Sequence, residues 1–188
     1  YREGKYVDVS GQSFRDFLDG KLPGRPGETP TMSDWSDHLT TIFPEVRLKK
    51  FLEMRGADGG PWRWLCALPA LWVGLLYDAD CQSAAWDLAK DWTLEEHNYL
   101  RAEVPRRGLR TKFRDGTVQD LALRVLEIAE AGLKRRAIFD KTGDDESGFL
   151  NTLWEIAERG YPASEKLLNL YETEWQKSVD PIYREFAY

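Results

Sequence analysis

The sequence predicts an α+β protein in which strands and loops fill the first third and a helix-rich layer follows. Short extended segments alternate with Gly- and Pro-rich loops up to Pro61, whereas helical periodicity dominates after it. The chain has 188 residues, of which 42% are hydrophobic and 31% charged, enough for one globular domain with a substantial core.

The first third combines short elements with residues that interrupt them. Gly20 can stop one helix, the side chain of Ser33 can cap the next, and Pro44 can end it. Three prolines and two glycines between the two helices predict a loop. The expected elements are a short strand over 5–9, a helix over 13–18, a loop over 21–30, a helix from 33 to about 42, extended segments over 45–48 and 50–55, and a tight loop over 56–61.

Helices account for most of the remaining chain. Thr93 and Glu96 have the spacing of a capping box, and Pro105 is expected to end that helix. Gly160 can stop the next-to-last helix, and Pro162 suits the start of the last one. The clearest amphipathic stripe consists of Leu121, Val125, Ile128 and Leu133. The expected helices span 62–77, 81–90, 93–104, 117–136, 149–159 and 162–171, with an acidic loop over 140–147.

Charge and cysteine content exclude several classes of protein. A net charge of −6 argues against sequence-independent nucleic-acid binding, which needs a basic surface, but leaves room for a local positive pocket. Two cysteines, Cys66 and Cys81, cannot build a disulfide framework, and with two histidines they argue against structural zinc. The apolar run 65–77 is too short to span a membrane. Reduced thiols and no N-terminal signal indicate a cytoplasmic protein.

One stretch, HLTTIFPEVRLKKFLEMRGADGGP, carries the candidate chemistry. Glu53 and Arg55 stand two residues apart on an expected strand, so their side chains point to the same face. A carboxylate beside a guanidinium on an open face suits a metal ion and a phosphate. Judged by spacing alone, a surface ion pair that contributes little to stability is the more common arrangement.

This stretch closely resembles glutamate–cysteine ligases of the plant and proteobacterial type. The resemblance extends to YVDVSGQSFRDFLDGKLPGRPGETPTMSDW before it and to GLRTKFRDG, GFLN, PASEKLL and SVDPIYREFAY after it, and so covers essentially the whole chain. It implies an ATP-dependent ligase that joins the γ-carboxylate of glutamate to the amine of cysteine through an acyl phosphate, the first step of glutathione synthesis. The implied fold is a glutamine-synthetase-like antiparallel sheet backed by helices.

The resemblance also implies roles for individual residues. Glu53 matches the position of a metal-ligating glutamate, and Arg55 matches a catalytic arginine that contacts the transferring phosphate. Mg²⁺ and ATP are therefore the expected cofactor and co-substrate. The expected partners are the small molecules glutamate, cysteine and ATP, with no nucleic acid and no membrane.

Five further residues of the stretch are weaker candidates. Arg47 could bind an anion or be a solvated strand arginine, and Thr40 and Thr41 could line the substrate pocket or pack within a helix. Asp58 is expected to support the Gly-rich turn or Arg55, with an ordinary turn aspartate as the alternative. His38 is expected to make a structural hydrogen bond from a helix.

The family places its glutamate-binding arginines, nucleotide-contacting segment and several metal ligands upstream of the segment that matches Tyr1. We therefore expect residues 1–188 to be the C-terminal portion of a single catalytic domain, with the active-site strands and loops in 1–61 and a helical layer in 62–188. Such a chain would need the upstream part of the same protein and would be inactive alone.

Plant members of the family use two disulfides for redox control. Val9 and Gly24 stand where one pair would lie, and Cys66 matches half of the other pair. We therefore expect no plant-type redox switch.

Two other functions remain open from the sequence. A related carboxylate–amine ligase could use another amine acceptor, or the chain could be a non-catalytic helical scaffold fragment.

Overall fold

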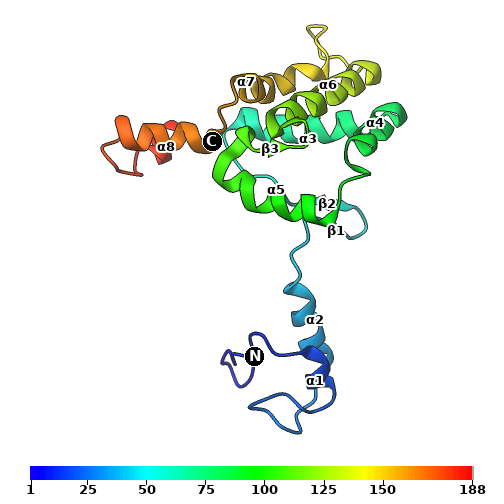
Figure 1. Ribbon diagram of the computed structural model, residues 1–188, viewed down its shortest axis with the longest axis vertical. Helices are drawn as coiled ribbons and strands as arrows, with labels where there is room; N and C mark the ends of the chain where they lie inside the picture. The colour runs from blue at the N-terminus through cyan, green and yellow to red at the C-terminus, as the bar shows by residue number, and fades with distance from the viewer. Residues whose placement is uncertain (188) are drawn as a thin grey trace. The chain divides into compact units, whose positions relative to one another are not determined.

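The computed structural model describes residues 1–187, which separate into two compact units, Tyr1–Ala57 and the chain from Asp58 onward (Figure 1). The chain is helix-rich with two small antiparallel hairpins, in agreement with an α+β protein. The first unit contains α1 (Phe14–Leu18), α2 (Met32–Thr40), β1 (Val46–Leu48) and β2 (Leu52–Met54). The second contains α3 (Trp62–Leu76), α4 (Ala79–Ala89), α5 (Leu94–Arg107), the 3-10 helix η1 (Gly108–Arg110), β3 (Lys112–Phe113), β4 (Gly116–Thr117), α6 (Val118–Arg136), the 3-10 helix η2 (Glu146–Leu150), α7 (Asn151–Arg159), α8 (Ala163–Thr173) and α9 (Ile182–Glu185).

Side-chain caps define the helices of the first unit. The hydroxyl of Ser13 accepts the amide of Arg15 at the start of α1, as its position before the helix predicts. Thr31, not Ser33, caps α2, so that helix begins earlier than expected. Thr31 prevails because Asp34 occupies the third helical position and its carboxylate accepts the Thr31 amide, which completes a capping box.

Arg2 ties the start of the chain to this capping box. Its guanidinium donates to both carboxylate oxygens of Asp34, at 2.6 and 3.1 Å, and its Nε donates to Glu28. Among the described residues of this unit, Leu22 is the one large apolar side chain that is fully buried. Charged contacts and caps therefore hold this unit together more than a hydrophobic core does.

The prediction of a strand over residues 5–9 is wrong. A single bridge joins Arg2 to Lys5 across a turn in which Gly4 has a φ of 76°. Such a turn needs the left-handed region that glycine adopts without strain. No strand of the described part of this unit lies alongside residues 6–9, so the segment has no ladder to join.

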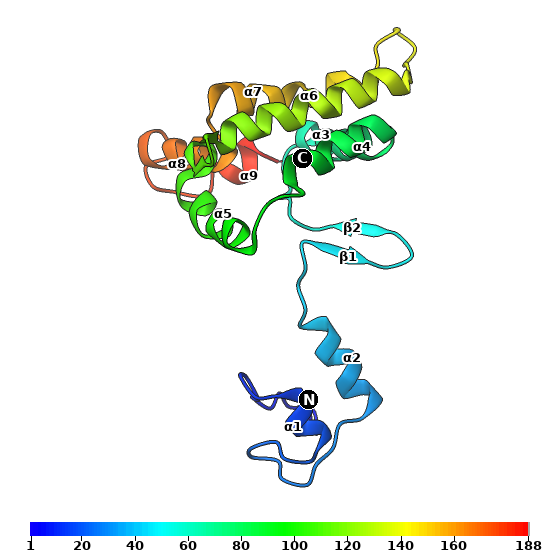
Figure 2. The same ribbon diagram turned by 45° about the vertical axis from the view of Figure 1, so that its right-hand side comes forward.

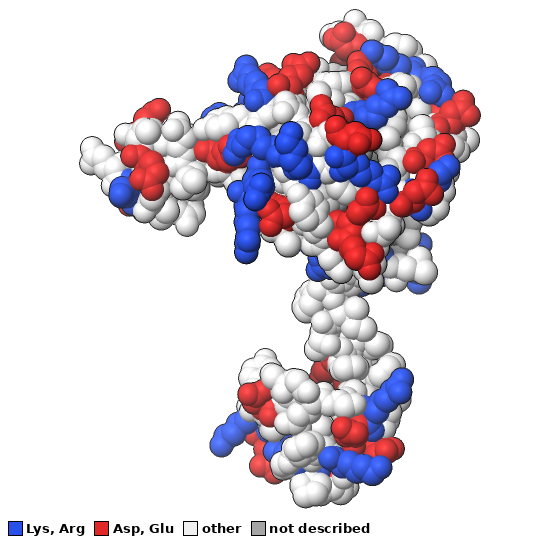
Figure 3. All heavy atoms as spheres, in the orientation of Figure 1, with Lys and Arg blue, Asp and Glu red and all other residues white. Residues whose placement is uncertain are grey.

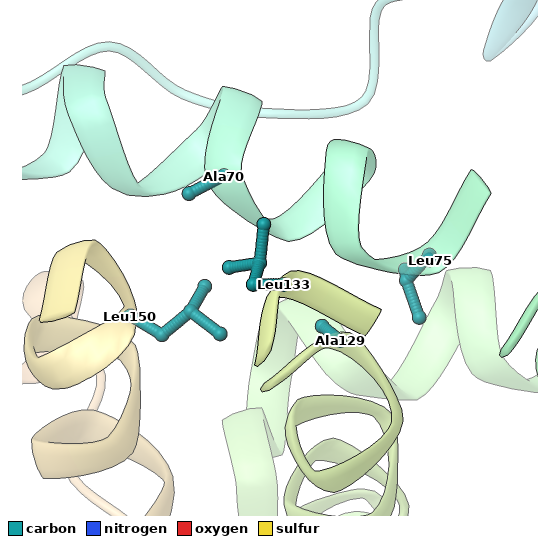
Figure 4. Packing of buried hydrophobic residues seen from close by; sticks show 5 residues of the cluster. All are labelled: Ala70, Leu75, Ala129, Leu133 and Leu150. Atoms are coloured by element: carbon teal, nitrogen blue, oxygen red, sulfur yellow. The ribbon is translucent and has the colours of Figure 1, made fainter. Parts of the chain in front are cut away.

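The core of the second unit forms where α3 and α6 pack together, with α4, α7 and η2 around them. Figure 4 shows Leu133 between Ala70 and Leu150. The buried members of the cluster are Ala70, Leu75, Ala129, Leu133 and Leu150. At the crossing, a Cβ added to Gly132 would lie 1.9 Å from the Gly74 carbonyl oxygen, so a side chain at this position would force the two helices apart.

Helix α6 follows its predicted start and most of its predicted face. Thr117 and Asp120 form its capping box. Leu133 of the predicted stripe is fully buried, and Val125 and Ile128 pack against the core cluster. The capping box predicted at the start of α5 and the Gly160 stop after α7 are confirmed.

Three features of the second unit differ from the prediction. Helix α5 continues through Pro105 to Arg107, because a proline in the last turn removes only one hydrogen bond and does not end the helix. The helix ends instead at Gly108, whose φ is 55°. The β3–β4 hairpin was not expected, since each strand is two residues long. The last helix is α9, not α8.

None of the described helices has the length and apolar character needed to cross a membrane.

Candidate active site

Strands β1 and β2 form an antiparallel hairpin (Figure 2), and its register places charged and apolar side chains on opposite faces. In an antiparallel pair, residues directly opposite each other point to the same face. Arg47 lies opposite Glu53 in the middle of the hairpin, so these two share a face. The other face is formed by the apolar pairs Val46–Met54 and Leu48–Leu52. The hairpin therefore has one charged and one apolar face.

Arg47 and Glu53 form an ion pair across the two strands. The Nε of Arg47 donates to Oε2 of Glu53 at 2.7 Å, and the two side chains are 38% and 32% exposed. The sequence offered both residues as candidates, but it did not pair them, because their contact depends on the register of the hairpin.

Arg55 follows directly after β2, which ends one residue earlier than expected. Its amide donates to the Glu45 carbonyl at 2.9 Å, which extends the pairing beyond β2. Its guanidinium carbon lies 5.7 Å from the centre of the Phe43 ring, a contact that the sequence analysis missed. Its Nη1 atom is buried and has no hydrogen-bond partner among the described residues. A buried donor without a partner is unfavourable, and an anion would satisfy it.

Three cations act on the Glu53 carboxylate. The hydrogen bond from Arg47 lowers the pKa of the Glu53 carboxyl most, against partial desolvation, and the charges of Arg47, Lys49 and Arg55 lower it further. Glu53 is therefore ionised at neutral pH, with three cations close to it. Elsewhere, acidic and basic side chains are interspersed on the surface seen in Figure 3.

The other candidates lie at the end of α2. The hydroxyls of Thr40 and Thr41 donate to the carbonyls of Asp37 and His38, at 2.6 and 2.7 Å. The ring of His38, for which a structural hydrogen bond is predicted, stacks on Phe14, with 4.3 Å between ring centres. Trp35 also lies against this imidazole, with 5.9 Å between ring centres.

A cavity of about 230 Å³ in the first unit includes two of these candidates, His38 and Thr41. Its lining is largely apolar and includes Val7, Phe14 and Phe17.

Glu53 can supply one oxygen ligand to a metal ion, but not a complete site. No group of three or more His, Cys, Asp or Glu side chains in residues 1–187 could hold a metal ion. Mg²⁺ typically keeps several waters and binds through one or two carboxylates plus substrate phosphates. The charged face fits that pattern, with Glu53 as one of those carboxylates. Asp58 is exposed and begins the second unit.

A carboxylate among cations, beside a buried guanidinium nitrogen that lacks a partner, is an arrangement suited to enzymes that act on phosphate-bearing substrates. Comparison with known proteins gives the family. The chain belongs to glutamate-cysteine ligase family 2, whose family model matches residues 4–185. The resemblance seen in the motifs is thereby confirmed.

Plant proteins match the chain along its whole length. "Glutamate--cysteine ligase A, chloroplastic" from Oryza sativa subsp. indica is 57% identical over 188 residues, which are 100% of this chain and 37% of that protein. "Glutamate--cysteine ligase, chloroplastic" from Solanum lycopersicum and from Arabidopsis thaliana are each 56% identical over 100% of the chain and 35% of their own length. The chain thus spans little more than a third of these relatives. Their chloroplastic names overturn the expectation of a cytoplasmic protein.

Proposed function

We propose that this chain is part of an ATP-dependent ligase that joins the γ-carboxylate of glutamate to the amine of cysteine, the first step of glutathione synthesis. The observation that carries the proposal is the similarity, along the whole chain, to proteins named glutamate–cysteine ligases. Because the chain covers 35–37% of those proteins, the activity is proposed for the full-length protein and the chain alone is expected to be inactive. The relatives' names also support a plastid location.

The reaction needs an activated carboxylate. An amine cannot displace an oxide from a carboxylate, so a γ-carboxylate oxygen first attacks the terminal phosphorus of ATP, which releases ADP and leaves an acyl phosphate. The cysteine amine then attacks the carbonyl carbon, inorganic phosphate leaves and the nitrogen loses a proton. Phosphoryl transfer of this kind depends mostly on positioning and on neutralisation of charge.

The charged face of the β1–β2 hairpin supplies two of the groups that this step needs. Arg55 contacts the transferring phosphate, because a planar guanidinium can donate two parallel hydrogen bonds to phosphate oxygens. Glu53 offers its Oε1 oxygen to a magnesium ion, which when bound neutralises charge on the phosphate oxygens. Thr41 and Thr40 contribute to the substrate pocket at the end of α2, while Asp58 and His38 support the local structure.

The apolar face of the same hairpin supports a larger sheet. Leu48 and Leu52 are 80% and 58% exposed, and a two-stranded hairpin is only marginally stable by itself. Antiparallel sheets commonly bury one face and leave the other open. We therefore propose that the hairpin belongs to a glutamine-synthetase-like antiparallel sheet within a single catalytic domain, whose open face carries the charged residues.

An assay of ADP release tests the function in the full-length protein. With glutamate, ATP and Mg²⁺ present, ADP release should depend on cysteine, and other amines in its place should support little turnover. The Glu53→Gln variant should lose about 100-fold or more in kcat, because it removes a charge used at the phosphate. Cysteine-independent ADP release, or equal turnover with another amine, would contradict the proposal.

A further inference from the structure

We propose that Arg47 is a positioning residue that holds the Glu53 carboxylate so that a single oxygen, Oε1, faces a bound divalent cation. This inference rests on the proposed function and adds to it a role for Arg47 other than direct contact with an anion. It comes from the register of the hairpin.

The hairpin contacts leave one oxygen of Glu53 open. Arg47 and Glu53 are the middle pair of the three pairs in the hairpin, and the Nε of Arg47 donates a hydrogen bond to the Oε2 of Glu53 at 2.7 Å. No described residue donates to Oε1. A carboxylate held in this way can bind a cation through one oxygen in one orientation. Residues that orient a metal ligand typically change metal affinity or activity by about 10- to 100-fold when they are removed.

The partial burial of the pair restricts its movement. The side chains of Arg47 and Glu53 are about two-thirds covered. The hydrogen bond to Glu53 therefore ties the arginine to the carboxylate across the two strands.

Charge and orientation predict opposite effects when Arg47 is removed. If Arg47 acted only through its charge, removal of a cation next to the site would strengthen the binding of another cation. If Arg47 positions Glu53, its removal frees the carboxylate to rotate and weakens cation binding. Lys49 is a matched control, because its charge also acts on Glu53 but it makes no hydrogen bond to that residue within the described structure.

Binding of Mn²⁺ to the full-length protein, followed by electron paramagnetic resonance without nucleotide, measures this directly. The Arg47→Met variant should bind Mn²⁺ about 10-fold more weakly than wild type. Lys49→Met should bind it as tightly or more tightly. In the Glu53→Gln background, Arg47→Met should cause no further loss.

The outcomes separate this inference from the function on which it rests. Mn²⁺ affinity at or above wild type in Arg47→Met, with a loss in Glu53→Gln, overturns the positioning role alone. An unchanged affinity in Glu53→Gln overturns the metal role of Glu53 and, with it, this inference. If circular dichroism shows that Arg47→Met does not fold, Arg47→Lys decides the question. Lysine has no nitrogen at the Nε position, so wild-type affinity in that variant also overturns the positioning role.

Discussion

Replacement of Gly132 by alanine tests how closely α3 and α6 pack. The added Cβ would lie 1.9 Å from the Gly74 carbonyl oxygen, whereas ordinary contacts begin at 3.4 Å. The helices would therefore have to separate by about 1.5 Å, the difference between these two distances. A gap of that size removes a large part of the dispersion attraction between the atoms on either side. The contact lies beside Ala129 and Leu133, so the core cluster would open with it.

The net effect combines two opposing terms. Overpacking of a core typically costs about 1–3 kcal/mol and sometimes more. Alanine is more favourable than glycine within a helix by about 1 kcal/mol, which offsets part of this cost. Because the clash is between a Cβ, whose position the backbone fixes, and a backbone carbonyl, neither atom can rotate away, and we expect a net loss of about 2 kcal/mol.

Thermal unfolding of the full-length protein, followed by circular dichroism, measures this loss. About 2 kcal/mol corresponds to a fall in melting temperature of about 4–8 °C for a domain of about 150–250 residues, and to a smaller fall for a larger domain. Gly148→Ala is the matched control, because a Cβ there meets nothing within 4 Å and its φ is not in the left-handed region. Equal melting temperatures for Gly132→Ala and Gly148→Ala would refute the packing argument.

Three further predictions follow from other contacts. Arg114 donates two hydrogen bonds to Glu96 and, with the Thr93 amide, lowers the pKa of the Glu96 carboxyl from 4.5 to about 2. The ionised Glu96 therefore contributes fully to stability above pH 4.5, and this contribution is lost as the pH falls toward 2. Arg114→Met should flatten that part of an acid-unfolding curve, and an unchanged curve would contradict the linkage. Asp34→Asn should lower the free energy of unfolding, measured by chemical unfolding, by about 2 kcal/mol, because it weakens the charged hydrogen bonds with Arg2. A decrease below about 0.5 kcal/mol would count against that role of Asp34. Reduced and oxidised full-length protein should migrate alike on a non-reducing gel, since no cysteine pair exists at positions 9 and 24. A mobility shift would show that a redox bridge forms.

Local rules predicted the parts of the fold that depend on near neighbours. The capping box of Thr93 and Glu96 and the glycine stop at Gly160 involve residues a few positions apart, so their hydrogen bonds can be anticipated without a partner element. Predictions were wrong where a distant partner decides. The strand over 5–9 had no neighbour to pair with in the described unit.

The sequence by itself determined the family, the helix-rich α+β character and the stretch that carries Glu53 and Arg55, because these depend on residue types and on spacing along the chain. Only the tertiary structure decided that Glu53 pairs with Arg47, because a shift of one residue in the register of the hairpin would turn one of these side chains to the opposite face. It also decided that α3 and α6 touch at Gly74 and Gly132, because close approach depends on two helices far apart in sequence meeting where neither has a side chain.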